Sequence, residues 1–200
     1  YGFNHRYHGS VQVAKKIIEK KYLGEVLNIR GLYGKSKIVT YNKGEWRAKR
    51  KFAGGGILLD QGIHMLDIIN YFCGPFNNYK SFVSNKYWNY DIEDDVFAIF
   101  KSLNGVIASI HSTAIQWEHK FRIEICLQKG SIELNGILSG TKSYGSESIT
   151  IIEVKNNKFK NKITKKKISF NKDNSWKKEI EEFANMLINN EKNKGISSTS

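Results

Sequence analysis

The sequence predicts an α+β domain, with helices packed on one face of a largely antiparallel, open-faced sheet. Three observations lead to this prediction. Two segments of helical period lie near the start of the chain, a series of segments with a period of two follows, and one more helical segment lies near the end. Runs of strands separated from runs of helices are typical of α+β folds. A length of 200 residues suits one domain.

Three segments have the residue spacing of helices. The first covers residues 10–22, with Ser10 as its expected N-cap, and a strand over 25–34 follows it. The second covers residues 56–72 and ends at a Gly-Pro pair. The third covers residues 176–189. Its apolar stripe is expected to face the core and consists of Trp176, Ile180, Phe183, Ala184 and Leu187.

The chain between the second and third helices is rich in Val, Ile, Phe and Tyr and has turn residues such as Asn104-Gly105 between its runs. Strands are expected over residues 79–88, 94–102, 105–115, 119–128, 130–138 and 147–154. Part of the sheet is apolar on both faces, since Phe97 and Ile99 alternate with Val96 and Ala98. The face without helices is therefore expected to associate with a second copy of the chain.

The formal net charge of +13 raises the question of nucleic-acid binding. Much of this charge lies in residues 155–172, where lysines mix with asparagines and the only rings are Phe159 and Phe170. Because stacking rings and base-reading arginines are scarce, we expect a solvated, lysine-rich face and no nucleic-acid partner. The sequence has no apolar run of the ~18 residues that a membrane span needs. It also lacks a signal-peptide pattern, and its two cysteines are too few for a disulfide scaffold. These features predict a cytoplasmic protein without a membrane partner.

The segment GGGILLDQGIHMLDIINYF, residues 54–72, carries the polar groups of greatest chemical interest. On an α-helix, Asp60, His64, Asp67 and Tyr71 share one narrow stripe, and apolar residues occupy most of the other positions. The i, i+4 spacing places Asp60 beside His64. The residues alone leave three interpretations open: a structural Asp–His hydrogen bond, a metal site of mixed oxygen and nitrogen ligands, or acid–base chemistry beside a glycine run.

The same segment resembles the signature of the Gfo/Idh/MocA oxidoreductases, in which Asp, Gly, His and Asp follow a glycine run at this spacing. Residues 4–26, the segment EWRAKRKF before the glycines, and the strand segments extend the resemblance over nearly the whole chain. SYGSE (143–147) and DNSWKKEIEEF (173–183) are similar to a bacterial branch linked to surface-polysaccharide synthesis. The resemblance implies that residues 1–200 are a substrate-binding and oligomerisation domain. It also implies that an N-terminal dinucleotide-binding domain and a final C-terminal helix are missing from the chain.

The family's activity implies an NAD(P)-dependent sugar or nucleotide-sugar dehydrogenase, which transfers hydride between a secondary alcohol carbon and nicotinamide. Asp60 and His64 match the family's catalytic residues: the His exchanges a proton with the reacting hydroxyl, and the Asp orients the His. The positions that the resemblance assigns to substrate binding are Asn4, Arg6, Tyr7, Trp46, Arg47 and Tyr144.

NAD or NADP is expected to bind mainly to the missing domain, because this chain has no Gly-x-Gly-x-x-Gly turn after a strand. No cofactor or metal ligand is expected within the chain. The expected partners are a sugar or nucleotide sugar and a second copy of the protein. A non-catalytic binding or dimerisation module is the alternative. The remaining histidines are expected to be structural: His5, His8, His111 and His119.

Overall fold

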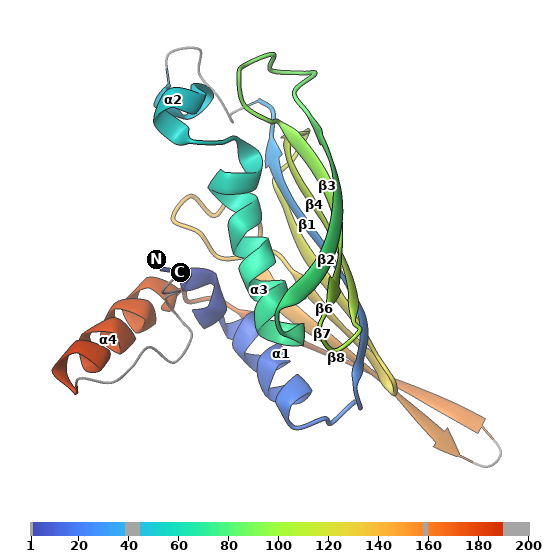
Figure 1. Ribbon diagram of the computed structural model, residues 1–200. Coiled ribbons are helices and arrows are strands. Elements are labelled where there is room, and N and C mark those ends of the chain that lie inside the picture. Colours follow the sequence, from blue (N-terminus) through green and yellow to red (C-terminus); the bar gives the residue numbers. More distant parts are fainter. Residues whose placement is uncertain (1, 39–44, 158–159, 190–200) are drawn as a thin grey trace.

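The computed structural model describes residues 2–38, 45–157 and 160–189, and within these ranges the chain forms one sheet with helices on one face (Figure 1). The strands are β1 (Val26–Ser36), β2 (Phe76–Ser84), β3 (Asp95–Ser102), β4 (Ile107–Gln116), β5 (Lys120–Leu127), β6 (Gly130–Asn135), β7 (Glu147–Asn157) and β8 (Lys160–Phe170). The helices are α1 (Gly9–Glu19), α2 (Arg50–Ala53), α3 (Ile63–Cys73) and α4 (Ser175–Ile188), and the short helical turns are η1 (Asn4–Tyr7), η2 (Trp46–Ala48) and the π-helical η3 (Leu58–Gly62).

The strands follow the order β2-β3-β4-β1-β5-β6-β7-β8. Neighbouring strands pair antiparallel, except that β1 and β4 pair parallel at the centre. The helices α1 and α3 cover one face, and α4 stands apart from the sheet (Figure 1). The predicted α+β class and the largely antiparallel sheet are therefore confirmed.

The core lies between α1, α3 and the covered face of the sheet. Strand alternation explains it, because every second side chain of a strand points to the same face. In β5, Ile123 and Ile125 are fully buried, whereas Arg122 between the strand's apolar residues is exposed. At Gly31 in β1, an added Cβ would lie 2.5 Å from the Sδ of Met65 in α3. Glycine at this position therefore allows the helix that carries His64 to approach the central strand closely.

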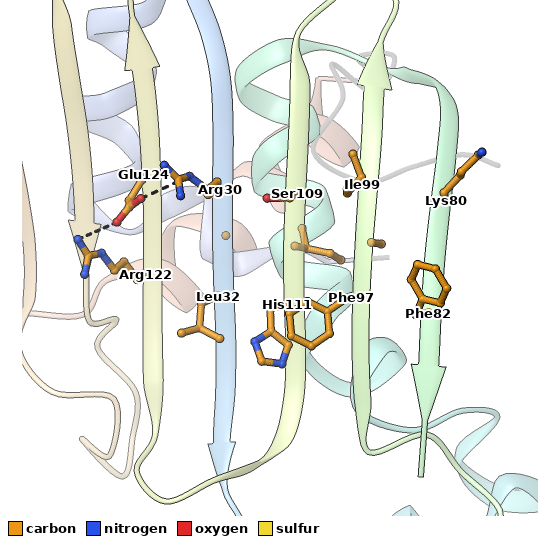
Figure 2. Close-up of a pocket in the computed structure, with 13 residues that line it drawn as sticks. Arg30, Leu32, Lys80, Phe82, Phe97, Ile99, Ser109, His111, Arg122 and Glu124 are labelled. Atoms are coloured by element: carbon orange, nitrogen blue, oxygen red, sulfur yellow. Dashed lines mark ion pairs between the residues drawn. The ribbon is translucent and has the colours of Figure 1, made fainter. Parts of the chain in front are cut away.

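The uncovered face of the sheet carries the apolar patch expected from the alternation of β3. Figure 2 shows Leu32, Phe97 and His111 on neighbouring strands of this face. These side chains line an open cavity of about 520 Å³. The ring of His111 stacks on Phe97 with 3.8 Å between centroids. At one side of the patch, Glu124 pairs with Arg122 at 2.7 Å. The surface is thus apolar at its centre and charged at its margin.

The lysine-rich run was expected to be a solvated face, and the structure makes most of it the edge strand β8. The lysine side chains at 165, 166 and 167 are exposed, as expected, but Ile168 and Phe170 pack against the core. Residues 158–159 of this run lie outside the described residues. The strand is hard to predict because lysines occupy both faces and hide the period of two. Lysines on an edge strand also hinder pairing with a further strand.

Helix α4 forms as expected, but its apolar stripe does not face the core. Trp176, Ile180, Phe183 and Leu187 are each more than half exposed. The helix contacts the rest of the domain through polar groups instead: Glu182 accepts a hydrogen bond from the Tyr7 hydroxyl at 2.7 Å. Helical period alone shows that a face is apolar, not what covers it.

The expected N-cap of the first helix is wrong by two residues. Helix α1 begins at Gly9, with His8 as its N-cap. The backbone N–H of Ser10 donates to Glu147 Oε1 at 2.7 Å, and His8 Nδ1 lies 2.9 Å from Glu147 Oε2. All three residues are buried. A carboxylate from distant β7 thus takes over the capping role assigned to the Ser10 hydroxyl.

None of the helices in the described ranges combines the length and apolar character that a bilayer crossing requires.

Candidate active site

The glycine run leads into η3 and fixes where the helix begins. Glu93 Oε1 accepts the backbone N–H groups of Gly56 (2.8 Å) and Leu58 (3.3 Å). A Cβ at Gly56 would lie only 2.0 Å from the Glu93 carbonyl oxygen, so a side chain does not fit there. At least this glycine therefore serves a close approach of two protein backbones rather than of a ligand.

The segment expected to be one continuous α-helix begins with the π-helical turn η3, which contains Asp60. A π turn changes the angular offset between residues four apart, so α-helical spacing no longer sets how Asp60 and His64 face each other. Lys35 Nζ, from β1, donates to Asp60 Oδ2 at 2.5 Å, and Arg47 Nε lies 3.7 Å from Asp60 Oδ1. Among the described residues, no hydrogen bond joins Asp60 to His64, and the buried Nδ1 of His64 has no partner. The structural Asp–His hydrogen bond, one of the three interpretations that the residues left open, is therefore not formed.

His64, at the start of α3, is held by rings. The imidazole of His5 stacks on it with 4.0 Å between centroids and 11° between planes. Phe3 meets it edge-on at 6.0 Å. Burial lowers the pKa of His64 below its ordinary value, although the charge of Asp60 opposes this shift. The imidazole is therefore neutral at neutral pH, the state in which one ring nitrogen can accept a proton.

His5, expected to be structural, thus lies directly on the candidate catalytic histidine. Its Nδ1 is 3.0 Å from Asn4 Oδ1, and its Nε2 is 3.0 Å from the Tyr33 hydroxyl. Burial holds the pKa of His5 well below its ordinary value, and the neighbouring His64 and His8 add to the effect. No spacing rule links His5 to His64, because η1 and α3 are far apart in the chain. Only the resemblance of residues 4–26 pointed to this segment.

Trp46 and Arg47, which the resemblance assigns to substrate binding, lie beside Asp60. They line a small cavity of about 180 Å³ together with Asp60 and Gly55. Trp46 is 54% exposed, and the Arg47 guanidinium lies over its ring at 4.4 Å. Trp46 is therefore not a core anchor for its loop. Residues 39–44 of the same loop lie outside the described residues.

Tyr144 packs next to η3, on the side of Gln61. Its hydroxyl donates to Gln61 Oε1 at 2.9 Å, and its ring meets Tyr33 edge-on at 5.2 Å. The ring of His119 lies 4.8 Å away. Burial raises the pKa of the Tyr144 hydroxyl, so this group acts as a neutral donor. The structure thus brings Tyr144 to the residue that follows Asp60.

The remaining three candidates lie on η1, and their polar groups contact other protein groups. Arg6 forms two bonds with Asp67 of α3, at 2.7 Å and 2.5 Å. Tyr7 donates to α4, as described above, and the Asn4 side-chain amide donates to Ser175 Oγ at 3.1 Å. These contacts attach η1 to two helices. A role of Asn4, Arg6 and Tyr7 in substrate binding stays a prediction.

Sequence reasoning missed Lys35, which contacts Asp60, and Tyr33, which contacts His5. Both lie on β1, on the side of the strand that faces η3 and α3. No motif distinguishes them, and only the tertiary pairing of β1 with the helix start brings them to the site. In the described part of the chain, no three His, Cys, Asp or Glu residues gather in a way that could hold a metal ion.

Residues 11–133 match the family model described as the GFO/IDH/MocA C-terminal domain. The chain belongs to the GFO/IDH/MocA family. Among curated relatives, levoglucosan dehydrogenase of Pseudarthrobacter phenanthrenivorans is 27% identical over 161 residues, which are 66% of this chain and 41% of the relative.

Solved structures of other proteins share the fold. A protein of Desulfitobacterium hafniense, assigned as an NADPH-dependent oxidoreductase, matches with a TM-score of 0.78 and 21% identity over 94% of this chain and 54% of its own. Levoglucosan dehydrogenase in complex with NADH and levoglucosan matches with a TM-score of 0.69 and 24% identity over 82% of this chain and 45% of its own. The chain thus spans about half the length of the proteins that it matches.

Proposed function

We propose that these 200 residues are the substrate-binding and oligomerisation domain of an NAD(P)-dependent dehydrogenase that acts on a sugar or nucleotide sugar. The reaction is the reversible oxidation of a secondary alcohol to a carbonyl. The observation that carries the proposal is a neutral imidazole, His64, one turn from a carboxylate, Asp60, that lines a cavity with an exposed Trp46. Family membership and the levoglucosan dehydrogenase relative support the same reaction class.

Each polar group has a separate task in this proposal. His64 accepts the proton of the reacting hydroxyl, because a neutral ring nitrogen is a base near neutral pH. Asp60, whose two oxygens lie near Lys35 and Arg47, accepts hydrogen bonds from neighbouring substrate hydroxyls. Trp46 provides an exposed flat surface of the kind on which a sugar ring packs. Tyr144 limits the site on the side of Gln61.

The NAD or NADP dinucleotide is held mainly outside these 200 residues in this proposal. The described residues contain no glycine-rich turn between a strand and a helix that would cradle a pyrophosphate, and Glu93 fills the position next to Gly56. Nicotinamide, when bound, supplies the hydride acceptor. A micromolar dissociation constant for NADH in calorimetry with the 200-residue chain would contradict the proposal that the dinucleotide binds mainly outside it.

The test of the catalytic assignment is a pair of measurements on the full-length protein: steady-state kinetics and thermal unfolding. His64→Ala is expected to lower kcat by about 10²–10⁴-fold with little change in KM. Asp60→Asn is expected to be nearly as harmful. Asp67→Asn is the matched control on the same helix, because Asp67 pairs with Arg6 and does not line the cavity beside Trp46. It is expected to lower stability while folded enzyme keeps its kcat. If folded His64→Ala keeps its kcat, the domain is a non-catalytic binding or dimerisation module.

We further propose that the uncovered sheet face associates with a second copy of the chain. The apolar patch around Phe97, open on one side and bordered by charge, supports this. Phe97→Glu is expected to convert a dimer or larger assembly to a monomer in sedimentation velocity. Phe183→Glu is the matched control: Phe97 is 51% exposed and Phe183 on α4 is 56% exposed. A wild-type protein that is monomeric at tens of micromolar, or an equal loss of assembly in both variants, would exclude this face as the site of self-association.

A further inference from the structure

Two imidazoles lie face to face in the candidate active site, and the proposed reaction uses only one of them. The rings of His5 and His64 are 4.0 Å apart and nearly parallel, at 11°. His64 Nδ1 is buried without a partner among the described residues, and Asp60 bonds to Lys35 instead. No hydrogen bond to that nitrogen therefore sets the orientation of the His64 ring. Ring packing against His5 and Phe3 remains.

The hydrogen-bond partners of His5 indicate which of its ring nitrogens carries the proton. The Asn4 amide nitrogen lies 3.1 Å from Ser175 Oγ, and the Asn4 Oδ1 atom faces His5. Because an amide oxygen only accepts, this arrangement places the proton on His5 Nδ1. In a neutral ring, Nε2 then accepts, and the Tyr33 hydroxyl donates to it. Burial lowers the pKa of His5, which is consistent with this neutral state.

We propose that His5 is the positioning residue for His64: held by Asn4 and Tyr33, its ring sets the plane of the catalytic imidazole and shields one face from water. This inference rests on the proposed function, because it gives His64 the role of proton acceptor. It assigns to His5 the orienting role that the family resemblance gave to Asp60. Misplacing a reacting group by about 1 Å can cost about 100-fold in rate, so a fixed ring plane matters to catalysis.

Other charged groups act on His64 as well, and their sum decides the sign of a pH effect. Asp60 raises the pKa of His64, whereas His8 and, above all, burial lower it. The neighbouring titratable groups on the packed elements are Asp60 of η3, Lys35 and Tyr33 of β1, His8 at the start of α1 with Glu147 of β7, and Tyr144. Removing the His5 ring admits water to His64 and reduces the effect of burial. The pKa of His64 then rises toward its ordinary value.

The first experiment measures kcat/KM against pH in full-length His5→Ala and His5→Phe. His5→Ala is expected to lower kcat about tenfold to a hundredfold and to move the acidic limb of the profile to higher pH. His5→Phe keeps a flat ring on His64 and is expected to restore much of kcat and to leave the limb near its wild-type position. A merely structural residue would change the melting temperature without moving the limb. An unmoved limb in folded His5→Ala would overturn the proposal.

The second experiment does not depend on turnover. In ¹⁵N spectra of histidine rings, wild-type His5 is expected to show the Nδ1–H tautomer, and Tyr33→Phe is expected to keep this tautomer and to change only the Nε2 signal, because Asn4 Oδ1 still accepts the Nδ1 proton. A wild-type His5 with its proton on Nε2, or one that titrates near its ordinary pKa, would overturn the proposal even if His5→Ala fails to fold. If the His64 ring titrates at higher pH in His5→Ala but His64→Ala keeps its kcat, the stack is real and the proposed function fails.

Discussion

Replacing Glu147 by alanine tests the buried pair that begins α1. The Glu147 and His8 side chains are almost fully buried. The Glu147 carboxylate accepts hydrogen bonds from His8 Nδ1 and from the backbone N–H of Ser10. Alanine leaves both groups buried without a partner. Removing one member of a buried, hydrogen-bonded pair costs about 3–5 kcal/mol, and the midpoint of a domain of this size falls by about 2–4 °C per kcal/mol. The expected decrease in melting temperature is therefore about 6–20 °C.

The matched control for this prediction is Glu153→Ala on the same strand. Glu153 is partly exposed, and its contacts are Lys155 at 3.7 Å and the Tyr22 hydroxyl at 3.2 Å. An exposed pair of this kind is worth less than about 1 kcal/mol. Urea unfolding of both variants measures the difference in free energy. If Glu147→Ala and Glu153→Ala differ by less than about 1 kcal/mol, the buried pair does not hold the start of α1.

The same pair makes a prediction about acid stability. Burial opposes ionisation of Glu147, but the hydrogen bonds from His8 and Ser10 outweigh it and hold the pKa of Glu147 below its ordinary value. The contribution to stability is therefore present above the unfolded-state pKa of about 4.3 and is lost as the pH falls through the lower folded-state value. Glu147→Gln is expected to flatten the acidic part of the stability curve. An unchanged acid transition would contradict the assignment.

Three further substitutions are expected to show that changes at packed positions lower stability more than changes at exposed positions. Gly56→Ala is expected to cost about 1–3 kcal/mol or more in urea unfolding, because the new Cβ meets the Glu93 carbonyl oxygen, whereas Gly140→Ala, with open space around it, is expected to be nearly neutral. Arg6→Met leaves Asp67 as an unpaired buried charge and is expected to lower stability by about 3–5 kcal/mol, with a smaller loss at acidic pH, where Asp67 is protonated. Phe183→Ser is expected to change the unfolding free energy of the 200-residue chain by less than about 0.5 kcal/mol, because its ring is exposed.

The fold was largely predictable, because most of its elements repeat a period that one sheet face or one helix face explains. The alternation in 94–102 separated the two faces of β3, and the structure buries Val96 and Ala98 on one face and exposes Phe97 and Ile99 on the other. The period failed at β8, where lysines lie on both faces of an edge strand. The prediction was also wrong at α4, where the apolar stripe is exposed. The residues of a helix determine that it has an apolar stripe, but the rest of the molecule determines whether this stripe is covered.

The candidate site was predictable only along one helix. The spacing of Asp60 and His64 identified the segment, but an α-helical projection cannot show that η3 is a π turn. The groups that contact these two side chains, Lys35 and His5, come from β1 and η1. They reach the site through strand pairing and helix packing, which no local pattern in the sequence encodes.

The position of β1 at the centre of the sheet sets an order in which the domain can assemble. Gly31 of β1 pairs with Ile110 on one side and with Ile123 on the other, so both partners of the first strand lie in the second half of the chain. During synthesis, this strand is made before both of its partners and stays unpaired until β4 and β5 emerge. Such distant pairings fold slowly and leave apolar strand surface open to aggregation in the meantime. Slow folding is therefore an expectation that follows from the topology itself.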